Sequence, residues 1–289
     1  MYTVTSEIYK ETNFKPTKGE DGKIVSKFQF KCPINETVNE NNEDSCGVTV
    51  DRDGDLVVHR RSNDIEKHDC VIEIQHSEAT EIRLVGLQVW RGALLLADFI
   101  FHKREEFKEM QLIELGAGVG LTSIAASMFV RKVICTDVDI GGILDLIRAN
   151  VKRNMKLCRR NSVEVLEYNF MQEEKNYSDE LLKAIDGSDI VVAADVIYDD
   201  DLTVAFVRVI EAIFHRELVS KRKKTIYVAL EKRYVFTMTE CDAVAPMFEH
   251  FVKLTMPKPW RFQYVHTDFP QYFQYERCKH LVLIKITSS

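Results

Sequence analysis

Five short apolar runs alternate with segments of helical periodicity between residues 111 and 230, and this alternation limits the fold more than any other feature. The predicted strands are residues 111–115, 132–136, 162–166, 189–194 and 225–230, and the predicted helices between them lie near 121–130, 142–157, 179–185 and 202–215. Strands that alternate with helices form βαβ units and a parallel sheet. The uninterrupted apolar run at 190–194 is typical of a strand buried on both faces. We therefore expect an α/β fold with helices on both faces of the sheet.

The pattern continues on both sides of these strands. Before them, apolar residues at helical spacing, such as Val89, Ala93 and Ile100, predict an amphipathic helix. After a last helix near 243–254, the runs 261–266 and 281–286 follow without a helical pattern between them, which predicts an antiparallel hairpin at the sheet edge. Residues 85–289 are thus expected to form one domain around a seven-stranded sheet.

The N-terminal part of the chain has a different character. Residues 1–50 are rich in Lys, Glu, Asn and Asp, so we expect a mostly flexible segment with one possible strand at 28–32. Residues 51–84 contain two alternating runs, 56–60 and 70–75, which could pair as an accessory β-hairpin. This region predicts a small N-terminal β extension to the main domain.

Composition excludes several classes of protein. The longest apolar stretches, such as 93–101, are far shorter than the roughly 20 residues that a membrane crossing needs, and the start resembles no signal peptide. We therefore expect an intracellular protein. The seven cysteines form no CxxC pair, so we expect no disulfide framework and no metal site. A net charge of −6 argues against tight non-specific binding to nucleic acid.

A glycine-rich turn from Glu114 to Gly120, ELGAGVG, joins the first parallel strand to its helix. Glycines at Gly116 and Gly118, with Ala117 between them, let the backbone approach a ligand closely. The third glycine comes one residue too early for the dinucleotide pattern GxGxxG. The loop therefore suits the compact carboxylate and amine of a methionine moiety better than a pyrophosphate.

The next two strands end in residues suited to a nucleoside. Asp137 follows the second strand, where its carboxylate can accept hydrogen bonds from both ribose hydroxyls of a nucleotide or of S-adenosylmethionine. The alternative is that Asp137 caps a helix that begins before Ile140. Glu167 and Tyr168 end the third strand, where the aromatic ring could flank adenine or serve only the core.

The fourth strand runs into Ala194-Asp195-Val196-Ile197-Tyr198. Because the carboxyl ends of parallel strands line the crevice of an open α/β sheet, we expect this motif beside the reacting group. The alternative for Asp195 is a cap of the following helix, although 199–201 supply three more aspartates for that purpose.

Taken in order and spacing, four motifs resemble the seven-strand protein lysine methyltransferases of methyltransferase family 16. They are ELGAGVG, the Thr136-Asp137 pair, the strand end LEY and the DxxY motif of ADVIY. The resemblance covers residues 51–289 and implies a Rossmann-like class I methyltransferase fold. It also implies transfer of a methyl group from S-adenosylmethionine to a lysine side chain of another protein, which leaves S-adenosylhomocysteine.

The resemblance assigns roles to individual residues. Asp195 and Tyr198 are the expected catalytic residues. The expected cofactor contacts are Trp90, Glu114, Gly116, Ala117, Gly118, Asp137, Glu167, Tyr168 and Ala194. Trp90 has the alternative role of anchoring its helix in the core. The family usually has Asp-Trp where this chain has Glu167-Tyr168, so we expect retained but weaker cofactor binding.

We further expect a monomer in the nucleus or the cytoplasm. The substrate that the resemblance implies is a nuclear winged-helix protein that binds nucleic acid, with no direct contact between this chain and the nucleic acid. A rival interpretation is a nucleic-acid methyltransferase, with the basic run 221–224 as a binding patch or nuclear signal. Val196 and Ile197, however, stand where base-methylating enzymes typically have two prolines. A non-catalytic binding protein is the other alternative, and the glycine spacing disfavours a dehydrogenase.

Overall fold

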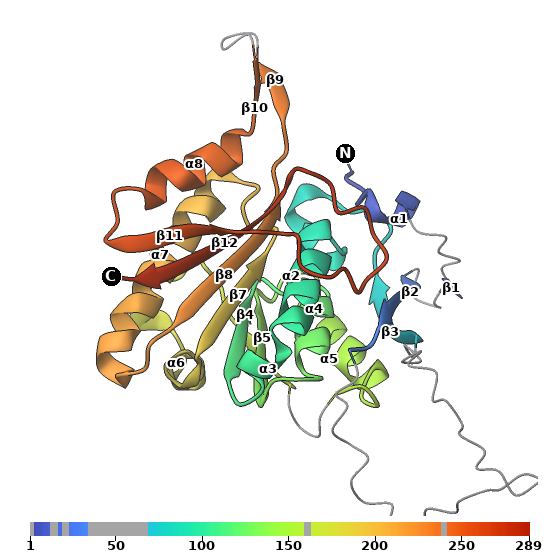
Figure 1. Cartoon of the computed structure of the whole chain (residues 1–289), viewed down its shortest axis with the longest axis horizontal. Coiled ribbons are helices and arrows are strands. Elements are labelled where there is room, and N and C mark those ends of the chain that lie inside the picture. Colours follow the sequence, from blue (N-terminus) through green and yellow to red (C-terminus); the bar gives the residue numbers. More distant parts are fainter. Residues whose placement is uncertain (1–2, 12–16, 19–22, 34–68, 159–162, 238–241) are drawn as a thin grey trace, which may run out of the picture.

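The computed structural model describes residues 3–11, 17–18, 23–33, 69–158, 163–237 and 242–289. Its centre is a seven-stranded sheet in the order β11-β12-β8-β7-β4-β5-β6 (Figure 1). Five strands run parallel: β4 (Gln111–Leu115), β5 (Lys132–Asp137), β6 (Val163–Glu167), β7 (Ile190–Ala194) and β8 (Thr225–Glu231). The last two, β11 (Trp260–Val265) and β12 (Leu281–Ser288), form an antiparallel hairpin at the β8 edge. The predicted sheet and its C-terminal hairpin are confirmed.

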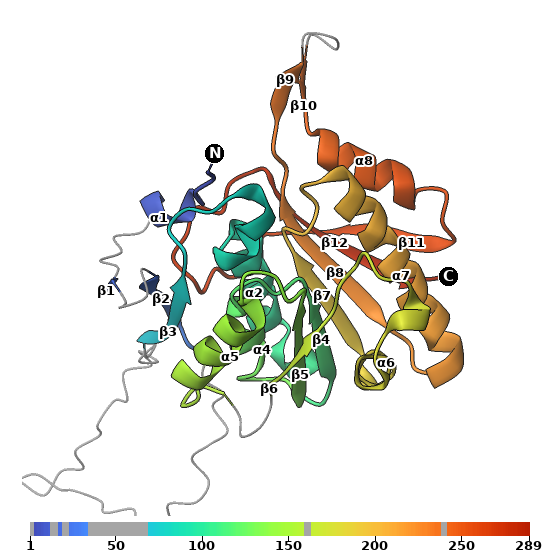
Figure 2. The same ribbon diagram turned by 180° about the vertical axis from the view of Figure 1, so that it is seen from behind.

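Helices cover both faces of this sheet, and a separate apolar core forms under each set. One face carries α2 (Arg91–His102), α3 (Arg104–Phe107), α4 (Leu121–Ala126) and α5 (Ile143–Arg153). The other carries α6 (Asp179–Gly187), α7 (Asp200–Ser220) and α8 (Pro246–Thr255). A short hairpin of β9 (Val235–Thr237) and β10 (Asp242–Val244) projects beyond the sheet near α8 (Figures 1 and 2). Two 3-10 turns, η1 (Ile82–Leu87) and η2 (Glu174–Asn176), complete the main domain.

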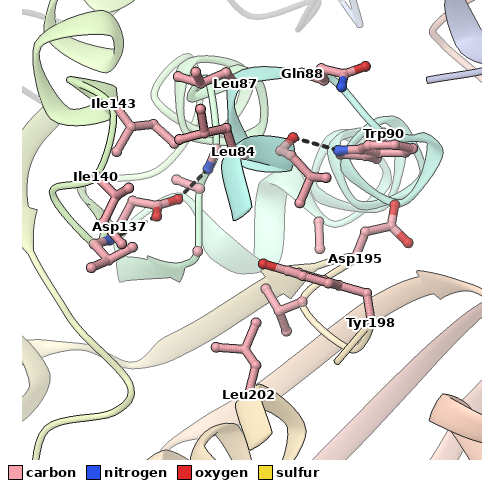
Figure 3. Close-up of a pocket in the computed structure, with 18 of the residues that line it drawn as sticks. Leu84, Leu87, Gln88, Trp90, Asp137, Ile140, Ile143, Asp195, Tyr198 and Leu202 are labelled. Atoms are coloured by element: carbon pink, nitrogen blue, oxygen red, sulfur yellow. Dashed lines mark hydrogen bonds between the residues drawn. The ribbon is translucent and has the colours of Figure 1, made fainter. Parts of the chain in front are cut away.

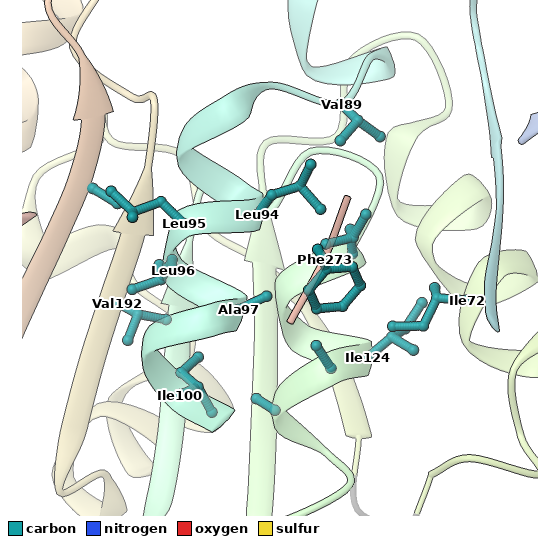
Figure 4. Packing of buried hydrophobic residues seen from close by; sticks show 14 of the residues in the cluster. Ile72, Val89, Leu94, Leu95, Leu96, Ala97, Ile100, Ile124, Val192 and Phe273 are labelled. Atoms are coloured by element: carbon teal, nitrogen blue, oxygen red, sulfur yellow. The ribbon is translucent and has the colours of Figure 1, made fainter. Parts of the chain in front are cut away.

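Helix α2 is buried on nearly all sides. The stretch Ile82–His102 is apolar and long enough to cross a membrane by composition, but 78% of its most apolar window is buried inside this fold. Leu95 and Leu96 belong to the apolar core on this face of the sheet (Figure 4). Phe101 belongs to the same core and contacts the rings of Phe30 and Phe273. The apolar composition of α2 is therefore accounted for by its place in the core.

The N-terminal segment contributes a short α1 (Ile8–Glu11) and a three-stranded sheet of β1 (Thr17–Lys18), β2 (Ile24–Lys31) and β3 (Asp69–His76). The outer edge of β3 bonds to two side chains of α5, because Asn150 and Asn154 each accept an N–H and donate to a carbonyl of β3. These side-chain amides therefore pair with the N–H and C=O groups of Glu73 and Gln75, which an edge strand would otherwise leave without hydrogen-bond partners.

Two expectations about this region need comment. The run predicted at 70–75 is β3, but its partner is β2, whereas the run 56–60 lies outside the described residues. The possible strand at 28–32 corresponds to β2, which begins earlier, at Ile24, and buries Phe28 and Phe30. Their alternation with polar residues is the pattern of a strand with one face on the core, and it was diluted by the polar sequence around it.

The loop between β11 and β12 is tied to α2 through Asp98, whose side chain is fully buried. Its carboxylate accepts hydrogen bonds from the backbone N–H groups of Tyr272 (2.8 Å) and Phe273 (3.0 Å), from the Tyr275 hydroxyl (3.0 Å) and from Arg277. Burial raises the pKa of Asp98, and these donors oppose the shift.

We expect Asp98→Ala to lower the free energy of unfolding by about 3 to 5 kcal/mol, because Arg277 and two backbone amides lose a buried partner. Denaturant titration measures this loss. Asp145→Ala is the matched control, since the Asp145 side chain is 88% exposed and pairs only with Arg148 on its own helix. A loss at Asp98 no larger than at Asp145 would contradict the role of this carboxylate.

Candidate functional site

A cavity of about 440 Å³ lies at the carboxyl ends of the parallel strands, within the size range of small-molecule sites. It is walled by the glycine loop, the ends of β5, β6 and β7, and the segment from η1 to the start of α2 (Figure 3). The predicted site residues that line it are Trp90, Glu114, Gly116, Ala117, Gly118, Asp137, Tyr168, Ala194, Asp195 and Tyr198. The structure therefore brings together almost the whole set that the sequence proposed.

The glycine loop adopts a backbone that side chains would strain. Gly116, Gly118 and Gly120 have φ values of +66°, +57° and +85°. A Cβ at Gly116 would lie 2.8 Å from a methyl group of Val196, and a Cβ at Gly118 would lie 2.9 Å from the carbonyl oxygen of Gly86. Glycine thus suits these positions for two reasons: the backbone has a positive φ, and Val196 and Gly86 approach too closely to leave room for a Cβ.

Asp137 braces this loop from the end of β5. One carboxylate oxygen accepts from the N–H of Gly118 (2.7 Å), and the other accepts from the N–H of Val138 (2.8 Å). Burial raises the pKa of Asp137 to about 6 against the effect of these two bonds. The alternative role as a helix cap is wrong, because α5 begins only at Ile143 and its cap position is Gly142.

Glu114 forms part of the cavity floor. Its carboxyl group is buried and accepts a hydrogen bond from the Ser123 hydroxyl on α4. Burial raises the pKa of Glu114 to about 7, and the nearby charge of Asp137 adds to the shift. Glu114 and Asp137 therefore both bind a proton more readily than exposed carboxyl groups do.

Tyr168 and Phe170 form an aromatic wall beyond β6, with ring centroids 5.5 Å apart. The Tyr168 ring is buried, and its hydroxyl donates to the hydroxyl of Tyr177 at 3.3 Å. Glu167, in contrast, has an exposed side chain that does not line the cavity. The exposed Glu167 side chain and the buried Tyr168 ring therefore do not share a site.

Asp195 adopts a left-handed backbone conformation, with a φ of +51°, immediately after β7. Its carboxylate accepts from the N–H of Gly92 (2.7 Å) and from the N–H of Glu231 (2.9 Å). Burial raises its pKa, while Arg233 and the two N–H bonds lower it. The alternative reading of Asp195 as a cap of the following helix is wrong, since Asp199 caps α7 through the N–H of Leu202 (3.0 Å).

Two aromatic residues stand beside Asp195. The Tyr198 ring lies across the cavity (Figure 3), and burial raises its pKa to about 12, so the hydroxyl keeps its proton at neutral pH. Trp90 directly precedes α2, donates from Nε1 to the Val85 carbonyl (2.9 Å) and carries the Arg233 guanidinium 4.6 Å from its ring centroid. Trp90 therefore fixes the start of α2 and lines the cavity at once.

Two contributors escaped the sequence analysis. Residues of η1 form a wall of the cavity, and Gly86 lies against the glycine loop, but a short irregular turn has no periodicity to reveal it. Gly92 holds Asp195 through its N–H. Its only sequence signal was the apolar stretch around it.

The basic run 221–224 is largely engaged in the fold. Lys224 is buried and donates to the carbonyls of Ile185 (2.6 Å) and Ser188 (2.9 Å), and burial lowers its pKa to about 8. Arg222 pairs with Asp189. This run therefore serves the junction of α6, α7 and β8, which weakens its interpretation as a nucleic-acid patch.

Comparison with known proteins places this arrangement in a family. Residues 67–242 match the model of the lysine methyltransferase family, methyltransferase family 16. The chain is 32% identical to methyltransferase-like protein 22 of Mus musculus, over 84% of this chain and 74% of the mouse protein. It is 35% identical to the Homo sapiens protein of that name, over 76% of this chain and 58% of the human protein.

Among solved structures, the methyltransferase domain of bacterial CtHen1 aligns with a TM-score of 0.45 and 13% identity, over 68% of this chain and 98% of that domain. The family match rests on sequence, and it covers the strands and loops that build the cavity. The chain belongs to the lysine methyltransferase family, as the order of its motifs predicted.

Proposed function

We propose that this chain transfers a methyl group from S-adenosylmethionine to the side-chain amine of a lysine in a protein substrate. The observation that carries the proposal is one shared cavity, in which the glycine loop, Asp137 and the Asp195–Tyr198 motif meet. Membership of the lysine methyltransferase family supports both the reaction and the acceptor.

The residues of the cavity fit the proposed cofactor. The backbone from Gly116 to Gly118 carries only the methyl group of Ala117 and lines the cavity, which suits the methionine part. Each oxygen of Asp137 accepts one N–H and keeps a lone pair for a ribose hydroxyl. Tyr168 and Phe170 offer an aromatic wall to adenine. When bound, S-adenosylmethionine supplies an electrophilic methyl group on a sulfonium.

The acceptor lysine must lose its proton before it can react. With a pKa near 10.4 in water, only about one lysine in 2,500 is neutral at pH 7, which is a cost of about 4.6 kcal/mol. An apolar cavity that already holds a cation lowers this pKa, because it disfavours a second positive charge. The cavity walls of this chain supply that burial.

Asp195 acts on the transition state in this proposal, and not as a simple base. A carboxylate beside an amine favours the ammonium form and would by itself raise the pKa of the lysine. During transfer, however, positive charge appears on the nitrogen, and a carboxylate fixed by two N–H donors stabilises it without reorganising. The protonated Tyr198 hydroxyl then orients the amine.

The rival functions have less support. A nucleic-acid substrate fits poorly with a net charge of −6 and with a basic run that is engaged in the fold. A purely non-catalytic binding role leaves the strained backbone of Asp195 without a purpose. The nuclear winged-helix substrate, the monomeric state and a place in nucleus or cytoplasm stay predictions that rest on the sequence alone.

The proposed function is tested with labelled S-adenosylmethionine and an extract of cells that lack the enzyme. We expect the added protein to label extract proteins, and mass spectrometry to place the methyl group on lysine. Label in RNA and not in protein would favour the nucleic-acid rival. Absence of label together with no cofactor binding at millimolar concentration would favour the non-catalytic one.

We expect Asp137→Ala to weaken binding of S-adenosylmethionine by about 2 to 4 kcal/mol, because two hydrogen bonds to a charged group are lost. Isothermal titration calorimetry measures the affinity. Asp139→Ala, two residues away with an exposed side chain, is the matched control and should bind normally. Equal affinities of the two variants would refute the ribose role.

Cofactor affinity should fall as the pH is lowered. The pKa of Asp137 is about 6, so below that pH the group is mostly protonated and has lost acceptor capacity. We expect weaker binding of S-adenosylmethionine at pH 5 than at pH 7.5, and a smaller pH effect in Asp137→Ala. Glu114, with a pKa of about 7, contributes to the same dependence, and Glu114→Gln isolates its share.

We expect Asp195→Asn to lower kcat by about 100-fold or more, because the amide keeps the shape of the side chain but not its charge. The dissociation constant of the cofactor should change little. Asp200→Asn, which alters an exposed aspartate of α7, is the control. Unchanged transfer by Asp195→Asn would remove this residue from the proposed mechanism.

A further inference from the structure

We infer that Arg91 and Gly92 are positioning residues for methyl transfer, and that Glu11 of the N-terminal segment completes the assembly that holds Asp195. The inference deepens the proposed function and rests on it, because Asp195 is taken as the group beside the acceptor amine. Arg91 and Gly92 directly follow Trp90, and Glu11 lies outside the residues that match the family model.

Gly92 allows the Asp195 carboxylate to reach the start of α2. A Cβ at this position would lie 2.6 Å from Oδ2 and 2.8 Å from Cγ of Asp195, and 3.1 Å from the carbonyl oxygen of Ala229. At such separations something must shift, and the Asp195 carboxyl group is the group in the way. A side chain at this position would therefore displace the carboxylate that accepts the 2.7 Å hydrogen bond from the Gly92 N–H.

Arg91 links the two backbone segments that hold Asp195. One N–H donor comes from Gly92, which follows Arg91 directly, and the other comes from Glu231. The Glu231 side chain in turn accepts from Nη1 of Arg91 at 2.7 Å. Because Arg91 is 9% exposed, this ion pair is weakly screened by water. The spacing of the two donors around the carboxylate is thereby fixed.

Glu11 closes the assembly from the N-terminal segment. One of its oxygens accepts from Nε of Arg91 (2.7 Å), and the other accepts from the backbone N–H of Glu276 (2.8 Å). The Glu11 side chain is 15% exposed, so it belongs to the interior of the cluster. Arg91 thus pairs with two partly buried carboxylates, those of Glu11 and Glu231.

Further contacts hold the same segment against the cavity wall. The Tyr9 hydroxyl accepts from the N–H of Val89 at 2.7 Å, and the N–H of Ser6 donates to the Gln88 side chain at 2.8 Å. Val89 and Gln88 both line the cavity. The N-terminal segment therefore contacts residues 88–89, which lie just before the start of α2.

The first experiment uses Gly92→Ala. We expect kcat to fall by about 10- to 100-fold, because a small displacement of a reacting group is enough for such a loss. Affinity for S-adenosylmethionine should stay unchanged. Gly187→Ala is the matched control, since its Cβ would meet only the end of the Gln111 side chain, at 3.0 Å, away from the cavity. A Gly92→Ala variant as active as this control overturns the inference.

A second readout does not depend on catalysis. Carboxyl-carbon NMR of the protein without cofactor follows the titration of Asp195, which burial and Glu231 shift upward and Arg233 and the two N–H donors shift downward. In Gly92→Ala, loss of the hydrogen bond from the residue-92 N–H should raise the Asp195 pKa above its value in the wild-type protein. If Asp195 titrates alike in the two proteins, the inference is overturned even if kcat has fallen. If the wild-type protein labels no protein substrate, the proposed function fails, whereas this titration still decides the geometry.

The third experiment separates positioning from general stability. Glu11→Gln should lower kcat roughly 3- to 10-fold and shift the Asp195 titration, with cofactor affinity unchanged. Glu7→Gln is the control, since Glu7 approaches the same Arg91 at 3.3 Å but is 72% exposed, where ion pairs contribute little. A Glu11→Gln variant that is only less heat-stable, or that matches Glu7→Gln in every measurement, overturns the role of Glu11.

Discussion

A carboxylate that is buried in a protein needs hydrogen-bond donors to replace water, and the two donors of Asp195 link the fold to the proposed site. The donors come from the first turn of α2 and from the end of β8, so the side chain joins two elements that are far apart in sequence. The cost is a left-handed backbone at a residue other than glycine. The benefit is a carboxyl group that lines the cavity in a fixed position, where the proposed mechanism needs to stabilise a developing positive charge.

Much of the sheet and of the site at its edge could be predicted from the sequence, because both depend on local patterns. Strand-length apolar runs predicted the parallel sheet, and the positions of Gly116, Asp137 and Asp195 after three of them predicted a common site. That inference needs only the rule that parallel strands end at one edge.

The remaining features depend on contacts between distant residues, which no local pattern encodes. Nothing near Gly92 in sequence indicates that its N–H meets a carboxylate 103 positions later. The same holds for β2, whose alternating residues are few and whose partner β3 lies beyond a long polar stretch. Glu167 shows a third limit, since placing a residue at the end of a strand does not determine the side to which its side chain points.

The cavity wall formed by residues 82–90 has two neighbours that are far apart in sequence. On one side Gly86 lies against the glycine loop, and on the other Gln88 and Val89 are hydrogen-bonded to Ser6 and Tyr9 of the N-terminal segment. A substitution at Tyr9 would therefore reach the cavity through the backbone of Val89, without a direct contact to the glycine loop. The N-terminal segment is in this sense part of the structural support of the site and more than an appendage to the main domain.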